Sequence, residues 1–76
     1  MTKKTRIIHY MSVGKNIRQL RKEKNLTQTE LAKLLFTSQD TISLWELDKS
    51  LPDVLSIIKM TKIFNVTSDY ILDIEK

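Results

Sequence analysis

One short segment of the chain collects side chains that can exchange hydrogen bonds with the edges of nucleic-acid bases. Gln39, Asp40, Thr41 and Ser43 carry amide, carboxylate and hydroxyl groups, and Leu44 follows them. Glutamine can pair with adenine through two hydrogen bonds, and an apolar side chain can contact the methyl group of thymine. An ordinary amphipathic helix with single exposed leucines would show the same residues. Both interpretations therefore stay open for this segment taken alone.

Asp40 has two interpretations of its own. Phosphates repel a carboxylate, so Asp40 would serve DNA binding by accepting a hydrogen bond from cytosine N4 or by disfavouring other bases. The alternative is that its charge stabilises the amino-terminal end of a helix dipole. The residue type is compatible with either role.

Cysteine, histidine and glycine, on which many metal sites, catalytic sets and phosphate loops depend, are nearly missing. The chain has no cysteine, one histidine and one glycine. These counts exclude a thiolate zinc site, a histidine cluster and a glycine-rich phosphate loop. No Ser/His/Asp or Cys/His catalytic set is recognisable in the sequence. We therefore expect no enzymatic activity, no metal and no cofactor.

Positive charge is concentrated at the start of the chain. The formal net charge is +4 and the sequence pI is about 9.5. Residues 1–24 hold eight lysine or arginine residues against a single glutamate. Such a segment suits a polyanionic partner, although a solvated helix face would have the same composition.

Helix start signals recur along the chain and predict an all-α fold. Ser12 precedes an apolar stripe at helical spacing, which predicts a helix over about residues 12–24. Thr27 and Glu30 fit a capping box that opens a helix over about residues 28–35. Ser38 is the next cap candidate, before a helix over about residues 39–47. In that helix Ile42 and Trp45 face inward, whereas Asp40, Ser43, Leu44 and Leu47 face outward.

Two further helices are expected after Pro52. Asp53 is able to cap the first of them, and its inner stripe is expected to contain Val54, Ile57, Met60 or Thr61, and Phe64. Thr67 is expected to cap a short last helix that carries Ile71 and Ile74. The second and third helices are separated by only about three residues, which fits a crossing at roughly 90–120°.

The residues in and around this turn resemble a known family. The stretch Leu26-Thr27-Gln28-Thr29-Glu30-Leu31-Ala32, then Ser38 and Thr41-Ile42-Ser43-Leu44-Trp45-Glu46, then Lys49 and Pro52, is similar to the lambda-repressor/Cro-like (XRE) helix-turn-helix family. Phe64-Asn65-Val66-Thr67-Ser68-Asp69 continues the match. The resemblance covers about residues 12–73 and implies a compact five-helix DNA-binding domain over residues 12–76, with a central helix-turn-helix.

The resemblance also implies roles for particular residues. Bases would be read by Gln39, Asp40, Thr41, Ser43 and Leu44, and the DNA backbone would be contacted by Thr27, Gln28, Ser38, Lys49, Ser50 and Arg18. Arg21 and Glu46 match a family ion pair between the first and third helices. We expect this pair to be exposed, with a contribution of only ~0–1 kcal/mol.

Two positions depart from the family pattern. Phe36 and Asp48 stand where the turn after the second helix and the loop after the third usually have glycine. A bulky residue at position 36 predicts a strained or differently shaped turn. Aspartate tolerates a left-handed backbone better than most residues.

The family mechanism implies that double-stranded DNA is the partner and that the protein forms a symmetric homodimer. One half-site of about four base pairs is too short to be specific, so we expect a pseudo-palindromic operator with half-sites about 34 Å apart. Candidates for the dimer surface are Leu55, Ile58, Ile63, Tyr70 and Leu72, although a broad core stripe would explain them equally well. A repressor is the expected role. The alternative is a protein-interaction module with a protein partner and a secondary DNA role.

Residues 1–11 precede the family domain as an extension with three interpretations. They form a solvated tail, an arm that contacts phosphate or the minor groove, or a short strand that pairs with a second subunit. No apolar run approaches the ~20 residues that span a bilayer, and the amino terminus lacks the features of a secretory signal. We therefore expect a soluble cytoplasmic protein at the nucleoid of a bacterial or phage system, without a membrane contact.

Overall fold

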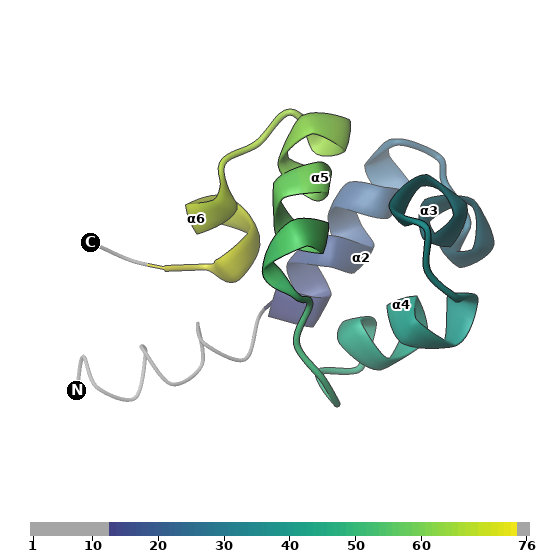
Figure 1. Cartoon of the computed structure of the whole chain (residues 1–76). Coiled ribbons are helices and arrows are strands. Elements are labelled where there is room, and N and C mark those ends of the chain that lie inside the picture. Colours follow the sequence, from purple (N-terminus) through teal and green to yellow (C-terminus); the bar gives the residue numbers. More distant parts are fainter. Residues whose placement is uncertain (1–12, 75–76) are drawn as a thin grey trace.

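The computed structural model describes residues 13–74, which form five α-helices and no strand. In chain order these are α2 (Val13–Glu23), α3 (Gln28–Leu35), α4 (Gln39–Glu46), α5 (Val54–Phe64) and α6 (Ser68–Leu72), labelled as in Figure 1. The all-α architecture predicted from the sequence is confirmed in this range. The three interpretations of residues 1–11 concern residues outside the described range.

The helices begin where the sequence places their caps. Thr27, Ser38, Asp53 and Thr67 precede α3, α4, α5 and α6, and each side chain accepts a hydrogen bond from the backbone N–H three residues later. At α3 the capping box is complete, because the Glu30 side chain also accepts from the Thr27 N–H at 2.8 Å. These side chains satisfy backbone donors that the first helical turn leaves without partners.

The core is formed by the inner faces of all five helices, with α2 in contact with both α4 and α6 (Figure 1). Its fully buried members include Ile17, Leu31, Ile42, Met60 and Ile71. Leu72 and Ile63, two of the dimer candidates, are partly buried against this core.

Two residues expected in the inner stripes are exposed instead. Val54 is 76% exposed. The buried face of α5 includes Ser56, and Val54 lies on the opposite side of the helix from Ser56. Ile74 is 51% exposed because α6 ends at Leu72 and Asp73 then takes a left-handed backbone conformation. Both corrections concern helix ends, where a stripe continued by periodicity leaves the core.

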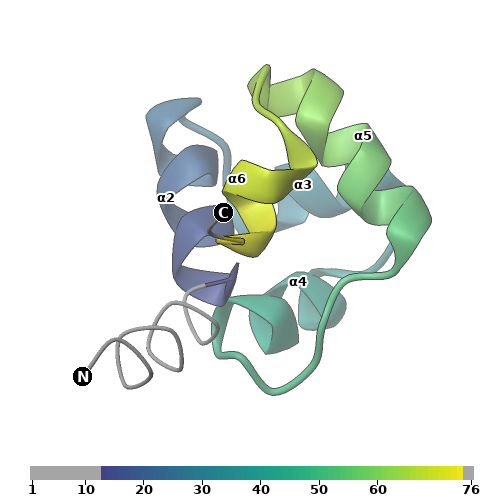
Figure 2. The ribbon, with the colours of Figure 1, turned by 90° about the vertical axis from the view of Figure 1, so that its left-hand side faces the viewer.

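Gly14 allows the first turn of α2 to approach the carboxyl end of α4 (Figure 2). A Cβ atom at this position would overlap the carbonyl oxygen of Trp45 and lie 2.8 Å from that of Glu46. The Gly14 N–H also donates a hydrogen bond to Asp48 Oδ1 at 2.9 Å. The only glycine of the chain therefore serves close packing, and α4 is braced by α2.

The cap of α5 gives an expected pH dependence. The pKa of Asp53 is lowered from its usual 3.8, first because its carboxylate accepts from the Ser56 hydroxyl and then because it accepts from the Ser56 backbone N–H. The pKa of Asp53 is lower in the folded protein than in the unfolded chain. The stability that the ionised Asp53 cap contributes is therefore present above about pH 4, and it is lost as the pH falls through the folded pKa. We expect the difference in melting temperature between the wild type and Asp53→Asn to shrink through this window, as measured by circular dichroism. A difference that stays constant with pH would contradict this assignment.

Candidate nucleic-acid interface

The turn between α3 and α4 keeps a compact shape although phenylalanine occupies the glycine position. Phe36 adopts a left-handed backbone with φ 57° and ψ 46°, and the Thr37 N–H donates to the Ala32 carbonyl at 2.9 Å. This conformation costs a residue with a side chain about 1 kcal/mol or more. The ring is 85% exposed, and the Lys59 ammonium lies 4.7 Å from its centroid. Of the two alternatives predicted at this position, strain rather than a different turn is found.

This turn presents α4 with one face outward. Ile42 and Trp45 are buried, as predicted, and they anchor the helix to the core. Gln39, Asp40 and Leu44 are exposed, whereas Thr41 and Ser43 are half-buried. The five proposed base-reading residues therefore differ in accessibility, and the three exposed ones lie along the amino-terminal and central part of the helix.

Gln28 connects the starts of α3 and α4. Its Oε1 accepts a hydrogen bond from Gln39 Nε2 at 2.6 Å, and its Nε2 donates to Glu46 Oε1 at 3.0 Å. Gln39 is thereby held in one orientation, with its own carbonyl oxygen left for another donor. Separate roles were predicted for Gln28 and Gln39, and their direct contact was missed because the two residues are eleven positions apart.

Arg21 and Glu46 form a close ion pair between α2 and α4. Arg21 Nε lies 2.6 Å from Glu46 Oε2, and Arg21 Nη2 donates to Glu46 Oε1 at 3.0 Å. The side chains are only 10% and 4% exposed, so the expectation of an exposed pair is wrong. The cause is that α2 packs directly on α4. The hydrogen bond that Arg21 donates to Glu46 raises the pKa of Arg21 above its ordinary value.

Ser38 and Thr27, two of the proposed backbone contacts, also serve as helix caps. Ser38 Oγ accepts from the Thr41 N–H at 3.2 Å and lies 2.9 Å from Thr41 Oγ1. Thr27 Oγ1 accepts from the Glu30 N–H at 3.1 Å. Because a hydroxyl that accepts still has a proton to donate, the Thr27 hydroxyl can also donate to a phosphate oxygen.

The remaining proposed backbone residues lie on two sides of α4. Lys49 and Ser50 are exposed in the segment that follows α4. Before them, Asp48 takes the left-handed conformation with φ 58°, which its side chain stabilises through the bond to Gly14. Arg18 is exposed on α2 and lines a surface depression together with Gln28, Ser43 and Leu47. The structure thus brings residues of α2, α3 and α4 together around the exposed face of α4.

Comparison with known proteins identifies this arrangement. The family described as Helix-turn-helix matches residues 17–71. The chain is 41% identical over 66 residues to the HTH-type transcriptional activator BcrR of Enterococcus faecalis. This alignment covers 87% of this chain and 32% of that protein. It is 34% identical over 62 residues to the HTH-type transcriptional regulator ImmR of Bacillus subtilis, with 82% of this chain and 49% of the relative covered. The chain thus spans about a third to a half of the length of these relatives.

A solved structure shows the same fold. The crystal structure of a transcriptional regulator from Listeria innocua superposes with a TM-score of 0.80 at 22% identity, and the match covers 84% of this chain and 60% of that one. None of the described helices is long and apolar enough to cross a bilayer. The family match, the relatives and the helix-turn-helix geometry lead to one conclusion: the chain belongs to the helix-turn-helix family of DNA-binding transcriptional regulators, of the lambda-repressor (XRE) type.

Proposed function

We propose that the protein is a sequence-specific regulator of transcription that reads double-stranded DNA by inserting α4 into the major groove. The observation that carries this proposal is the division of α4 into two faces. Ile42 and Trp45 hold it to the core, while Gln39, Asp40 and Leu44 project outward. A helix presented in this way after a short turn fits the width of the major groove.

Binding is proposed to combine phosphate contacts with base contacts. Arg18, Gln28 and Lys49, helped by Thr27, Ser38 and Ser50, would fix the orientation of the domain on the sugar-phosphate backbone. The cations among them would release condensed counterions, which supplies affinity without sequence preference. Gln39, Asp40 and Leu44 would then discriminate base pairs. The half-buried Thr41 and Ser43 would contact bases beside them.

We propose a homodimer on a pseudo-palindromic operator. Leu55 and Ile58 on α5 and Tyr70 on α6 are large and exposed, so they are the better candidates for the contact between subunits. Ile63 and Leu72 are partly buried in the core and contribute less surface. Sedimentation of the protein alone and on DNA tests the dimer, since a monomer bound to each operator would contradict it.

Repression is the proposed outcome of binding, in the cytoplasm at the nucleoid and without enzymatic activity or cofactor. A protein that occupies a promoter blocks transcription without any further contact, whereas activation requires one. The relative BcrR is named an activator, so a reporter assay that compares transcription with and without the protein tests the proposed sign directly. Increased transcription would contradict repression.

Selection of bound duplexes from a random pool, followed by sequencing, is the experiment that tests DNA reading as a whole. The enriched site is then titrated against a random duplex at low salt. Tight binding with a preference for the enriched site supports the proposal. Binding that occurs only after addition of a protein partner favours the interaction-module alternative instead.

Gln39→Ala and Leu44→Ala are each expected to weaken binding to the selected site by about 1–3 kcal/mol and to relax specificity at the contacted base pair. The reason is that each variant removes a group directed at a base edge and leaves the phosphate contacts in place. Affinities for duplexes substituted at single positions measure both effects.

Lys49→Ala provides the contrast within the same assay. It is expected to weaken binding to cognate and random duplexes equally and to reduce the salt slope by about one. If Gln39→Ala lowers affinity for random DNA as much as for the selected site, Gln39 does not read bases.

A further inference from the structure

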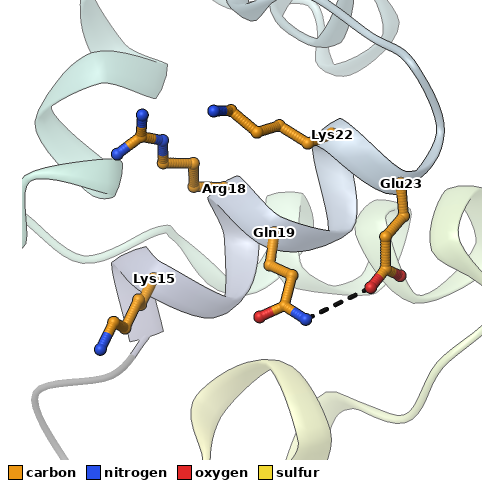
Figure 3. Close-up of a pocket in the computed structure, with 5 residues that line it drawn as sticks. All are labelled: Lys15, Arg18, Gln19, Lys22 and Glu23. Carbon is orange, nitrogen blue, oxygen red and sulfur yellow. Dashed lines mark hydrogen bonds between the residues drawn. The ribbon is translucent and has the colours of Figure 1, made fainter.

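The outer face of α2 carries three cations that no described contact neutralises. Lys15, Arg18 and Lys22 line a shallow surface depression with Gln19 and Glu23 (Figure 3). Arg18 and Lys22 are directed to one side of the helix in this view, and Gln19 and Glu23 to the other. Glu23 is engaged with the Gln19 amide at 3.3 Å. Within residues 13–74, none of the three cations has an acidic partner.

The fourth cation of α2 is used differently. Arg21 is buried and paired with Glu46, so it contributes no free positive charge to the surface. Lys15 and Lys22 are seven positions apart, which places their Cα atoms on nearly the same side of a helix and about 10 Å apart along its axis. The Lys15 side chain is directed away from those of Arg18 and Lys22 in Figure 3. The three residues form a basic stripe, defined as Lys15, Arg18 and Lys22.

The basic stripe adjoins the proposed DNA-reading surface at one residue. Arg18 lies in the depression shared with Gln28, Ser43 and Leu47, and it also lies in the depression shared with Lys15 and Lys22. The stripe therefore touches the α4 side of the molecule at Arg18, its middle member, and extends from there in both directions along α2, to Lys15 and to Lys22. Its length is comparable with the rise of about three base pairs along the DNA axis, at about 3.4 Å for each nucleotide of a strand.

We propose that Lys15 and Lys22 bind the phosphate backbone of DNA outside the base pairs read by α4 and so lengthen the contact with each half-site. This proposal rests on the proposed function. It names a surface outside α3 and α4, and it assigns that surface to phosphates because its cations have no acidic partner within residues 13–74, are spaced along α2 and include Arg18, which also borders α4. The contacts carry no sequence preference, since no base edge is involved.

The test compares the double variant Lys15→Gln/Lys22→Gln with a matched variant, Lys33→Gln/Lys62→Gln, which removes the same charge from exposed positions on α3 and α5. Each is titrated against two duplexes of the selected site. One duplex ends at the outermost base pair that is read, and the other continues for about six base pairs on both flanks. Affinity is measured as a function of salt concentration, and circular dichroism melting verifies that both variants are folded.

On the long duplex the first variant is expected to flatten the salt slope by about 0.9 for each phosphate that is no longer neutralised, and to weaken binding roughly eightfold for each such phosphate at about 0.1 M salt. On the short duplex it is expected to match the wild type, and the preference for the selected site over random DNA should be unchanged. Equal losses on both duplexes, equal losses with the matched variant, or no loss at all would each overturn the proposal. A wild type without any preference for the selected site would instead refute the proposed function.

Discussion

Replacing Trp45 by alanine is expected to lower the free energy of unfolding by about 3–5 kcal/mol. Trp45 is 3% exposed and belongs to the core cluster that joins all the described helices. Truncation removes a large buried surface and leaves a cavity that the neighbouring helices fill only in part. For a domain of this size the loss approaches the whole stability. Equilibrium denaturation in urea, followed by circular dichroism, measures it.

Leu47→Ala is the matched control for Trp45→Ala. Leu47 is the carboxyl-terminal cap residue of the same helix but is 61% exposed, so its truncation is expected to change the stability by no more than about 0.5 kcal/mol. Trp45→Phe keeps an aromatic ring in the core and should fall between these two variants. An unchanged melting temperature for Trp45→Ala would mean that this side chain is not part of the core.

Glu46→Ala is expected to cost about 3 kcal/mol, because it removes one partner of a nearly buried ion pair. The guanidinium of Arg21 would retain only its bond to the Leu26 carbonyl at 2.7 Å, and Gln28 would lose its acceptor. Since Gln28 also orients Gln39, we expect weaker DNA binding in addition to lower stability. Denaturation and duplex titration separate the two effects.

Glu23→Ala removes the same charge from an exposed position on α2 and is expected to be nearly neutral for stability. Arg21→Met combined with Glu46→Leu should recover most of the stability that Glu46→Ala removes, because no charge remains buried. It should not recover DNA binding, since Gln28 still lacks its acceptor. If Glu46→Ala destabilises no more than Glu23→Ala does, the pair contributes no more than an exposed one.

The parts of the fold that were predictable from the sequence depend on short-range chemistry. Thr27 and Glu30 are three residues apart, and their capping box requires nothing beyond the local helix. Ile42 and Trp45 were assigned to the core from spacing alone, and both are buried. Periodicity fails at helix ends, as Val54 and Ile74 illustrate, because it does not say where the neighbouring helices stop.

The parts of the candidate site that were missed depend on contacts between distant segments. Gln28 is hydrogen-bonded to both Gln39 and Glu46. These bonds form only because the turn at Phe36 lets α3 pack against α4. The burial of Arg21 and Glu46 follows from the close approach of α2 at Gly14. Residue types suggested each group separately, but only the packed structure shows that they form one connected set.

The phenylalanine at the α3–α4 junction has a consequence for how the domain meets its target. Glycine at a left-handed position would leave a swivel between the two helices, because it can adopt many other conformations. At position 36 the alternatives are fewer, and the Lys59 ammonium lies over the phenylalanine ring. We therefore expect the angle between the two helices to vary less before any encounter than a glycine would allow. Little motion is left to be frozen when the complex forms, and the entropic penalty of association falls accordingly.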